Sequence, residues 1–196
     1  MDLVKNGKYI EEDKQRVCWY KDGKLHREDD LPAIEYFNGS KNWFQNGKYH
    51  RENGPAIELY EDGFLIEQHW MKNGQRHRED GPAIIVDIPD EIRKKYQKEN
   101  KKLHLNGCHW WINNQHHRDD GPASEYANGD KHWYKENMKH REDGPAVERI
   151  DGTEEWWVFG VKKTGVEYIS WLKLYLLKEN LEKDLKNKEK LKTIKI

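Results

Sequence analysis

The chain has 196 residues, of which 35% are hydrophobic and 36% are charged. So low an apolar fraction argues against a thick two-layer core, whereas nine Trp and ten Tyr argue against disorder. The formal net charge of −1 gives no global field that would attract nucleic acid or an anionic membrane, so we expect no specific nucleic-acid partner. A thin sheet rich in aromatic residues fits this composition.

The amino-terminal residues contain no apolar run of the kind found in signal sequences. No stretch approaches the roughly 18 apolar residues of a membrane-spanning helix. The chain has two cysteines, Cys18 and Cys108, which is typical of a protein from a reducing compartment. We therefore expect a protein that is neither secreted nor transmembrane and that does not insert into membranes.

From Trp19 onward one motif recurs five times: Trp, six residues, His-Arg, acidic residues and then Pro-Ala. The prolines fall 23, 27, 40 and 23 residues apart, so the base period is 23 with two insertions. The motif predicts an array over 1–167, with units near 18–41, 42–67, 68–102, 103–131 and 132–154 and a degenerate unit at 155–167. The positions that recur in every unit form a predicted structural ladder of Trp19, His26, Trp43, His50, Trp70, His77, Trp110, His117, Trp133 and His140.

Thirteen of the fifteen glycines follow Asn or Asp, and pairs such as Asp22-Gly23 favour two-residue hairpin turns of type I′. Counting outward from these turns places each Trp opposite the His of its own unit, on one face of the sheet. The same count around Asn38-Gly39 places Ile34 opposite Trp43, and around Asp151-Gly152 it places Val147 opposite Trp156. We expect this tryptophan face to carry the core.

Alternation along a strand then sends the residue after each His to the opposite face. That face would hold the arginines and a series of glutamates as a charged ladder, which serves solubility and register more than stability. The expected members are Arg27, Arg51, Arg78, Arg118, Arg141, Glu35, Glu58, Glu125 and Glu148.

Two segments depart from the repeat. The insertion in the third unit has a capping Asp87, Pro89 in the first turn, early acids and later bases, which predict a helix over 88–101. Residues 168–196 lack Gly and Pro and predict a carboxyl-terminal helix that caps the array or mediates a dimer. Its expected interface residues are Trp171, Leu172, Tyr175 and Leu176.

Three chemical alternatives are weaker than a structural role. Metal binding needs convergent ligands, but each repeated His meets a Trp, and the adjacent His116-His117 pair would point to opposite faces. A catalytic thiol at Cys18 or at Cys108 beside His109 has no partnering acid defined by the sequence. Aromatic residues can stack on bases or sugars, but core packing explains the tryptophans better. We expect no catalytic, metal or cofactor site.

The segments Trp-Tyr-Lys-Asp-Gly-Lys-Leu-His-Arg-Glu-Asp at 19–29 and His-Arg-Glu-Asp-Gly-Pro-Ala at 140–146 resemble MORN-like repeats. More narrowly, they are similar to the Trp/His-Arg-x-Asp-Gly-Pro-Ala repeats of giant viruses of amoebae, particularly of the marseillevirus group. The resemblance covers residues 4 to about 167, and the Gly-x-Gly ending of the standard MORN repeat is absent. It implies an elongated single-layer antiparallel β-meander of tandem hairpins with scaffold or interaction roles.

The combined expectation is a mainly β, non-enzymatic structural or protein-interaction protein, a scaffold of the virion or of the infected host cytoplasm. Its partners would be unidentified proteins and a second copy of the chain, in a homodimer. The alternative is an antitoxin-like regulatory module that inhibits a partner protein, because bacterial antitoxin-like proteins carry related Asn-Gly hairpin repeats. A hydrolase that uses His/Asp pairs is a third, weaker hypothesis.

Overall fold

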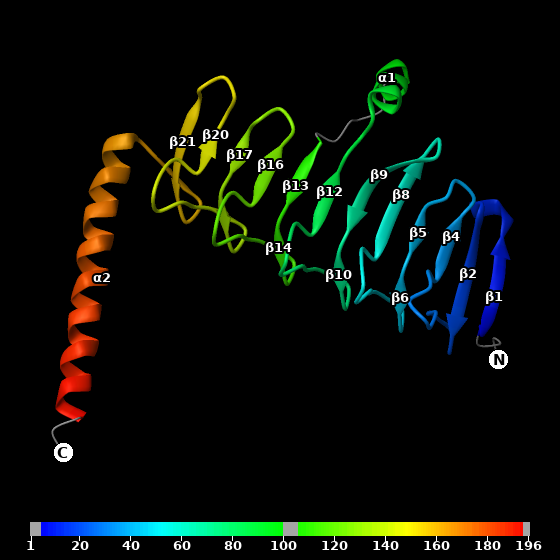
Figure 1. Ribbon diagram of the computed structural model, residues 1–196, viewed down its shortest axis with the longest axis horizontal. Coiled ribbons are helices and arrows are strands. Elements are labelled where there is room, and N and C mark those ends of the chain that lie inside the picture. Colours follow the sequence, from blue (N-terminus) through cyan, green and yellow to red (C-terminus); the bar gives the residue numbers. More distant parts are fainter. Residues whose placement is uncertain (1–4, 100–105, 194–196) are drawn as a thin grey trace.

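The computed structural model describes residues 5–99 and 106–193, with side chains to residue 188. The chain is mainly β and forms an antiparallel meander in which each strand pairs with its neighbours in chain order (Figure 1). A helix is inserted in the third unit and a second helix follows the last strand, so the predicted fold class is confirmed. The hairpins lie side by side in one long row (Figure 1).

The main sheet contains fourteen strands. They are β1 (Gly7–Glu11), β2 (Arg16–Lys21), β3 (Lys24–Leu25), β4 (Ile34–Tyr36), β5 (Lys41–Asn42), β8 (Ile57–Glu61), β9 (Phe64–His69), β12 (Ile84–Val86), β13 (Gly107–His109), β16 (Ser124–Tyr126), β17 (Lys131–His132), β20 (Val147–Glu148), β21 (Glu154–Val158) and β22 (Val161–Lys163). A short 3-10 helix, η1 (Glu12–Lys14), joins the first two strands.

At the tryptophan of units two to five the chain leaves the main sheet and forms a separate two-stranded hairpin. These hairpins are β6 (Phe44–Gln45) with β7 (Lys48–Tyr49), β10 (Met71–Lys72) with β11 (Gln75–Arg76), β14 (Trp111–Ile112) with β15 (Gln115–His116), and β18 (Tyr134–Lys135) with β19 (Met138–Lys139). Units two to five therefore each add one small hairpin to their strands in the main sheet, whereas in the first unit β3 pairs with β2 of the main sheet.

The small hairpins have the predicted type I′ turns. In Asn46-Gly47, for example, φ is +50° and +80°, and both residues of each equivalent turn have positive φ. Trp and His of one unit are paired across the hairpin, because the His26 amide donates to the Trp19 carbonyl oxygen at 3.0 Å and the later units repeat this bond. The predicted Trp-to-His pairing is confirmed at the level of the backbone.

The turns at the other end of the units differ from the prediction. Ile34 pairs with Asn42 and not with Trp43, and Val147 pairs with Glu155 and not with Trp156. The loop between Tyr36 and Ser40 has three residues, with Gly39 at φ +94° and the Ser40 amide bonded to the Asn38 side chain. One extra residue shifts the register by one and turns every following side chain to the opposite face.

The apolar clusters consequently lie on the face of the residue before each tryptophan, and of the repeated tryptophans only Trp43 is buried as expected. We call this face the inner face; it carries Cys18, Asn42, His69, His109 and His132 from consecutive units, with Ile34, Ile57, Ile84, Ser124 and Val147 between them. One apolar cluster gathers Cys18, Ala33, Ile34 and Phe44 near the amino-terminal end. A second cluster forms where helix α1 joins the sheet.

Helix α1 (Asp90–Lys98) is shorter than the predicted helix over 88–101, and its N-cap residue is Pro89 and not the predicted Asp87. Residues 100 and 101 of the prediction fall outside the described part of the chain. Ile92 of α1 packs with Val86 and Ile88. Helix α2 (Gly165–Thr193) begins three residues earlier than predicted, because the Thr164 hydroxyl and the Glu167 carboxylate form a capping box. Within the described residues, neither helix is long and apolar enough to cross a membrane.

Candidate functional site

The repeated tryptophan of each unit lies beneath the repeated arginine. The guanidinium carbon of Arg27 is 3.7 Å from the ring centre of Trp19, and Arg51 is 3.9 Å from that of Trp43. The same stack recurs at 4.0–4.1 Å in the pairs Trp70/Arg78, Trp110/Arg118 and Trp133/Arg141. The arginines and tryptophans thus share one face, which we call the outer face, and the prediction of opposite faces is wrong for these residues.

Each stacked arginine is also held at its edges. In the fifth unit Arg141 donates to the Pro145 carbonyl oxygen and to the carboxylates of Asp143 and Glu148. The equivalent carbonyl contact is present in all five units. The third unit has Ile85 where the others have Glu, so its Arg78 is held by Asp80 alone among carboxylates. The repeated arginines and glutamates therefore hold the tryptophans in place and do not form a separate charged face.

The repeated histidine joins each unit to the next. The backbone amide of Asn46 in the second unit donates to Nδ1 of His26 in the first, at 3.1 Å. The adjacent Gly47 amide donates to the Leu25 carbonyl oxygen at 2.8 Å. Amides of the following turns meet the imidazoles of His50, His77, His117 and His140 in the same way, at 3.2–3.3 Å.

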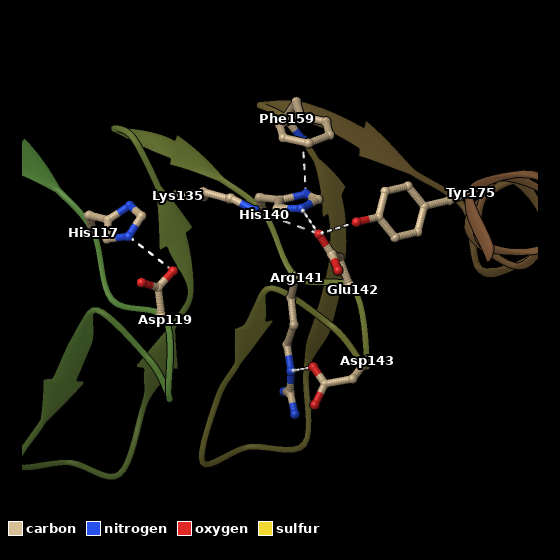
Figure 2. Close-up of polar contacts among 9 residues, drawn as sticks. All are labelled: His117, Asp119, Lys135, His140, Arg141, Glu142, Asp143, Phe159 and Tyr175. Carbon is tan, nitrogen blue, oxygen red and sulfur yellow. Dashed lines mark hydrogen bonds and ion pairs between the residues drawn. The ribbon is translucent and has the colours of Figure 1, made fainter. Parts of the chain in front are cut away.

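An imidazole that accepts at Nδ1 must carry its proton on Nε2 when neutral. In every unit Nε2 faces the carboxylate two residues later, for example at 2.9 Å between His50 and Glu52. In His117 and His140 this contact has hydrogen-bond geometry with Asp119 and Glu142 (Figure 2). The acidic residue thereby selects the tautomer that can bind the next unit.

Grooves lie between the His-Arg-acid loops of successive units. One has a volume of about 570 Å³ between units two and three, and another has about 550 Å³ between units three and four. Their rims carry the most exposed carboxylates of the loops, such as Asp80, Asp119 and Asp120, each more than 80% exposed. The outer face therefore presents a periodic series of acidic loops and shallow grooves.

Helix α2 closes the carboxyl-terminal end of the array. Phe159 stacks on His140 at 4.0 Å between ring centres, and Trp171 meets the same imidazole edge-on at 5.8 Å. The Tyr175 hydroxyl donates to Glu142 at 3.2 Å (Figure 2). Among the residues expected at an interface, Trp171 and Tyr175 thus contact the array, Leu172 is half-buried and Leu176 is 51% exposed.

Sequence reasoning missed a row of polar residues on the inner face. His109 and His116 both hydrogen-bond to the hydroxyl of Ser124, at 2.8 and 2.9 Å. His116 also stacks between Trp111 and Tyr134, and burial lowers its pKa to about 4. Ser124 is fully buried, so its hydroxyl is not exposed to solvent. In the sequence, this row could have been found as the residue that directly precedes each repeated tryptophan.

The thiols and candidate metal ligands give no reactive site in the described part of the chain. Burial raises the pKa of both Cys18 and Cys108, which disfavours the nucleophilic thiolate. Among the described residues, no three His, Cys, Asp or Glu side chains converge as metal ligands. His116 and His117 belong to different contacts, with Ser124 and Asp119 respectively.

No family model matches the chain, and no curated protein matches it. A role for this chain is therefore inferred from the contacts that its repeated residues make.

Proposed function

We propose that the protein is a non-enzymatic scaffold that binds a protein partner along several consecutive units of its outer face. One observation carries the proposal: Trp, His and Arg of each unit are occupied in holding the array together. What the units then offer in common is an extended surface of exposed acidic loops and grooves. Such a surface suits a partner that contacts many equivalent positions, whereas catalysis needs one asymmetric constellation.

Helix α2 supplies a second element of the proposal, a homodimer. Leu174, Leu177, Leu181 and Leu185 recur at three- or four-residue spacing and are 55–69% exposed. At 100° per residue this leucine stripe faces away from Tyr168 and Tyr175, which contact the array. An apolar stripe of this kind is typical of an interface, and a second copy of α2 would cover it.

Cross-linking the protein in its native assembly tests the scaffold role. Lys48, Lys72 and Lys135 lie in the small hairpins of units two, three and five. The scaffold predicts cross-links from several of them to the same partner. Cross-links confined to one unit would contradict it, as would turnover of a substrate that is lost in His77→Ala.

A charge-matched pair of variants tests the contribution of the loops. Asp119→Asn with Asp120→Asn removes two exposed carboxylates from one loop and should weaken partner binding by at most about tenfold, because several units share the contact. Glu12→Gln with Asp13→Asn removes the same charge from η1, outside the grooves, and should leave binding unchanged. If both pairs weakened binding equally, the loops would contribute only through the net charge of the protein.

Light scattering tests the dimer. Leu177→Lys with Leu181→Lys should give a monomer, whereas Asn180→Lys with Asn187→Lys adds the same charge beside the leucine stripe and should leave the dimer intact. A monomeric wild-type protein would contradict this part of the proposal.

We propose in addition that the scaffold acts in the virion or the host cytoplasm, because its units resemble those of giant viruses. Quantitative proteomics of purified particles separates the scaffold from the alternative, an antitoxin-like inhibitor, because an abundant particle component is not expected of an inhibitor.

A further inference from the structure

A groove on the inner face breaks the symmetry of the repeats. It has a volume of about 430 Å³ and lies where units three and four meet. The strands at this boundary, β12 and β13, are near the middle of the row (Figure 1). Its floor is Ile84 and Val86 of β12, and its walls include Arg76, Trp111 and Tyr126. The volume falls within the range of about 300–1,000 Å³ that is typical of small-molecule sites.

The third unit leaves this part of the inner face without an aromatic pair. Met71 and Arg76 stand where the second unit has Phe44 and Tyr49, which stack at 4.1 Å. Gly107 lies next to the groove and pairs with two of its lining residues, Val86 and Tyr126. A Cβ atom at Gly107 would lie 2.5 Å from the Glu125 carbonyl oxygen, so the strands approach closely there.

Two hydrogen-bond donors in the walls lack an acceptor. Nε of Arg76 and Nε1 of Trp111 are both buried and have no hydrogen-bond partner. The Arg76 guanidinium lies 5.3 Å from the Trp111 ring centre, so the two side chains are neighbours in the wall. A buried donor without an acceptor is destabilising, and an acceptor brought by a ligand would relieve that cost.

The charge of the groove limits what the acceptor can be. Among the arginines of the described residues, only Arg76 and Arg93 have no described carboxylate within 4.0 Å, so no direct ion pair occupies the Arg76 guanidinium. Glu67 also lines the groove and bonds to His69. Its carboxylate would repel a dianion, so the balance favours a ligand with a single negative charge.

We propose that this groove binds an organic monocarboxylate with a flat apolar body. Its carboxylate accepts hydrogen bonds from Arg76 and Trp111, and its body packs on Ile84, Val86 and the ring of Tyr126. Arginine suits this role because its planar fork matches the geometry of a carboxylate.

Calorimetric titration of the full chain with 2-naphthoate and with the neutral 2-naphthamide tests the proposal. We expect saturable binding of 2-naphthoate, and affinity for 2-naphthamide lower by about tenfold or more, the equivalent of one charge-assisted contact. The Arg76→Gln variant should lose the same factor. Arg93→Gln changes the other arginine that lacks a carboxylate partner and should bind as the wild type does.

Trp111→Phe provides a second probe, since it keeps the ring and removes the indole donor, and it should weaken 2-naphthoate binding. Amide chemical shifts of Ile84 and Tyr126 should move during the titration. The proposal is overturned if 2-naphthoate does not bind saturably, if it binds no better than 2-naphthamide, or if Arg76→Gln leaves its affinity unchanged.

Discussion

The Phe159 backbone amide donates to Nδ1 of His140 at 3.3 Å, across the boundary between the fifth unit and the last (Figure 2). The four preceding boundaries contain the same bond. The histidine contact therefore joins the small hairpins of successive units, beside the strand pairing that joins the units in the main sheet. The following predictions concern these contacts and their neighbours.

Replacing His50 with Ala should destabilise the array. The substitution leaves the Asn73 amide without its acceptor and removes a buried ring, at a cost of about 1–3 kcal/mol. For a chain of this length that corresponds to a fall in Tm of roughly 2–4 °C per kcal/mol. Gln45→Ala, an exposed position of the same hairpin, is the matched control and should change Tm little. Equal Tm values for wild type and His50→Ala would contradict the role of the histidine.

Arg141→Lys should also destabilise the protein, although it retains the charge. A lysine cannot both cover the Trp133 ring and reach the Pro145 carbonyl oxygen and Glu148. We expect a loss of about 1–2 kcal/mol in chemical denaturation. Lys135→Arg on the neighbouring hairpin is the reverse control and should be neutral. A lysine variant as stable as the wild type would show that the stack contributes little.

Stability should fall as the pH drops from about 6.5 towards 4. The pKa of His116 is about 4 in the folded protein because the ring is buried, so acid protonates the unfolded chain first and favours unfolding. Burial lowers the pKa of His132 and His140 as well. Full stability is therefore present above pH 6.5, and His116 alone accounts for a loss on the order of 3 kcal/mol by pH 4.

Denaturation of His116→Phe at pH 7 and pH 5 checks this assignment. Phenylalanine keeps a flat ring between Trp111 and Tyr134 and cannot titrate. The variant should lose less stability than the wild type between the two pH values. An unchanged difference would assign the acid sensitivity to other groups.

Two glycines should respond oppositely to alanine. Gly107→Ala places a Cβ against the backbone of β16 and should cost more than about 2 kcal/mol. Gly165→Ala lies in the first turn of α2 in open space and should be neutral or stabilise the helix by up to about 1 kcal/mol. Thermal melts of the two variants give the comparison, and a Gly107→Ala protein as stable as the wild type would contradict the close approach of the strands.

The sequence predicted the meander and the pairing of Trp with His because Asx-Gly turns require positive φ and fix the register of their own hairpin. It did not predict the other register, since Asn38-Gly39 fits a two-residue or a three-residue turn equally well. In the structure the residue after the glycine donates its backbone amide to the Asx side chain two residues earlier. The donors are Ser40, Asp130 and Thr153. That bond belongs to the three-residue loop.

The contacts between units were beyond prediction for a different reason. Nδ1 of His26 meets Asn46, twenty residues away, and neither residue type indicates the bond by itself. The groove on the inner face likewise depends on residues from several strands, such as Arg76 of β11, Val86 of β12 and Tyr126 of β16. Contacts of this kind follow from the stacking distance of the units, which the sequence period does not give.

The histidine contact can be observed directly by NMR of a ¹⁵N-labelled sample. An N–H···N hydrogen bond transmits a scalar coupling between its two nitrogens, so each of the five imidazoles should show Nδ1 coupled to a turn amide of the next unit and a proton on Nε2. Protonated Nδ1 atoms without such couplings would contradict the account of how the units are joined.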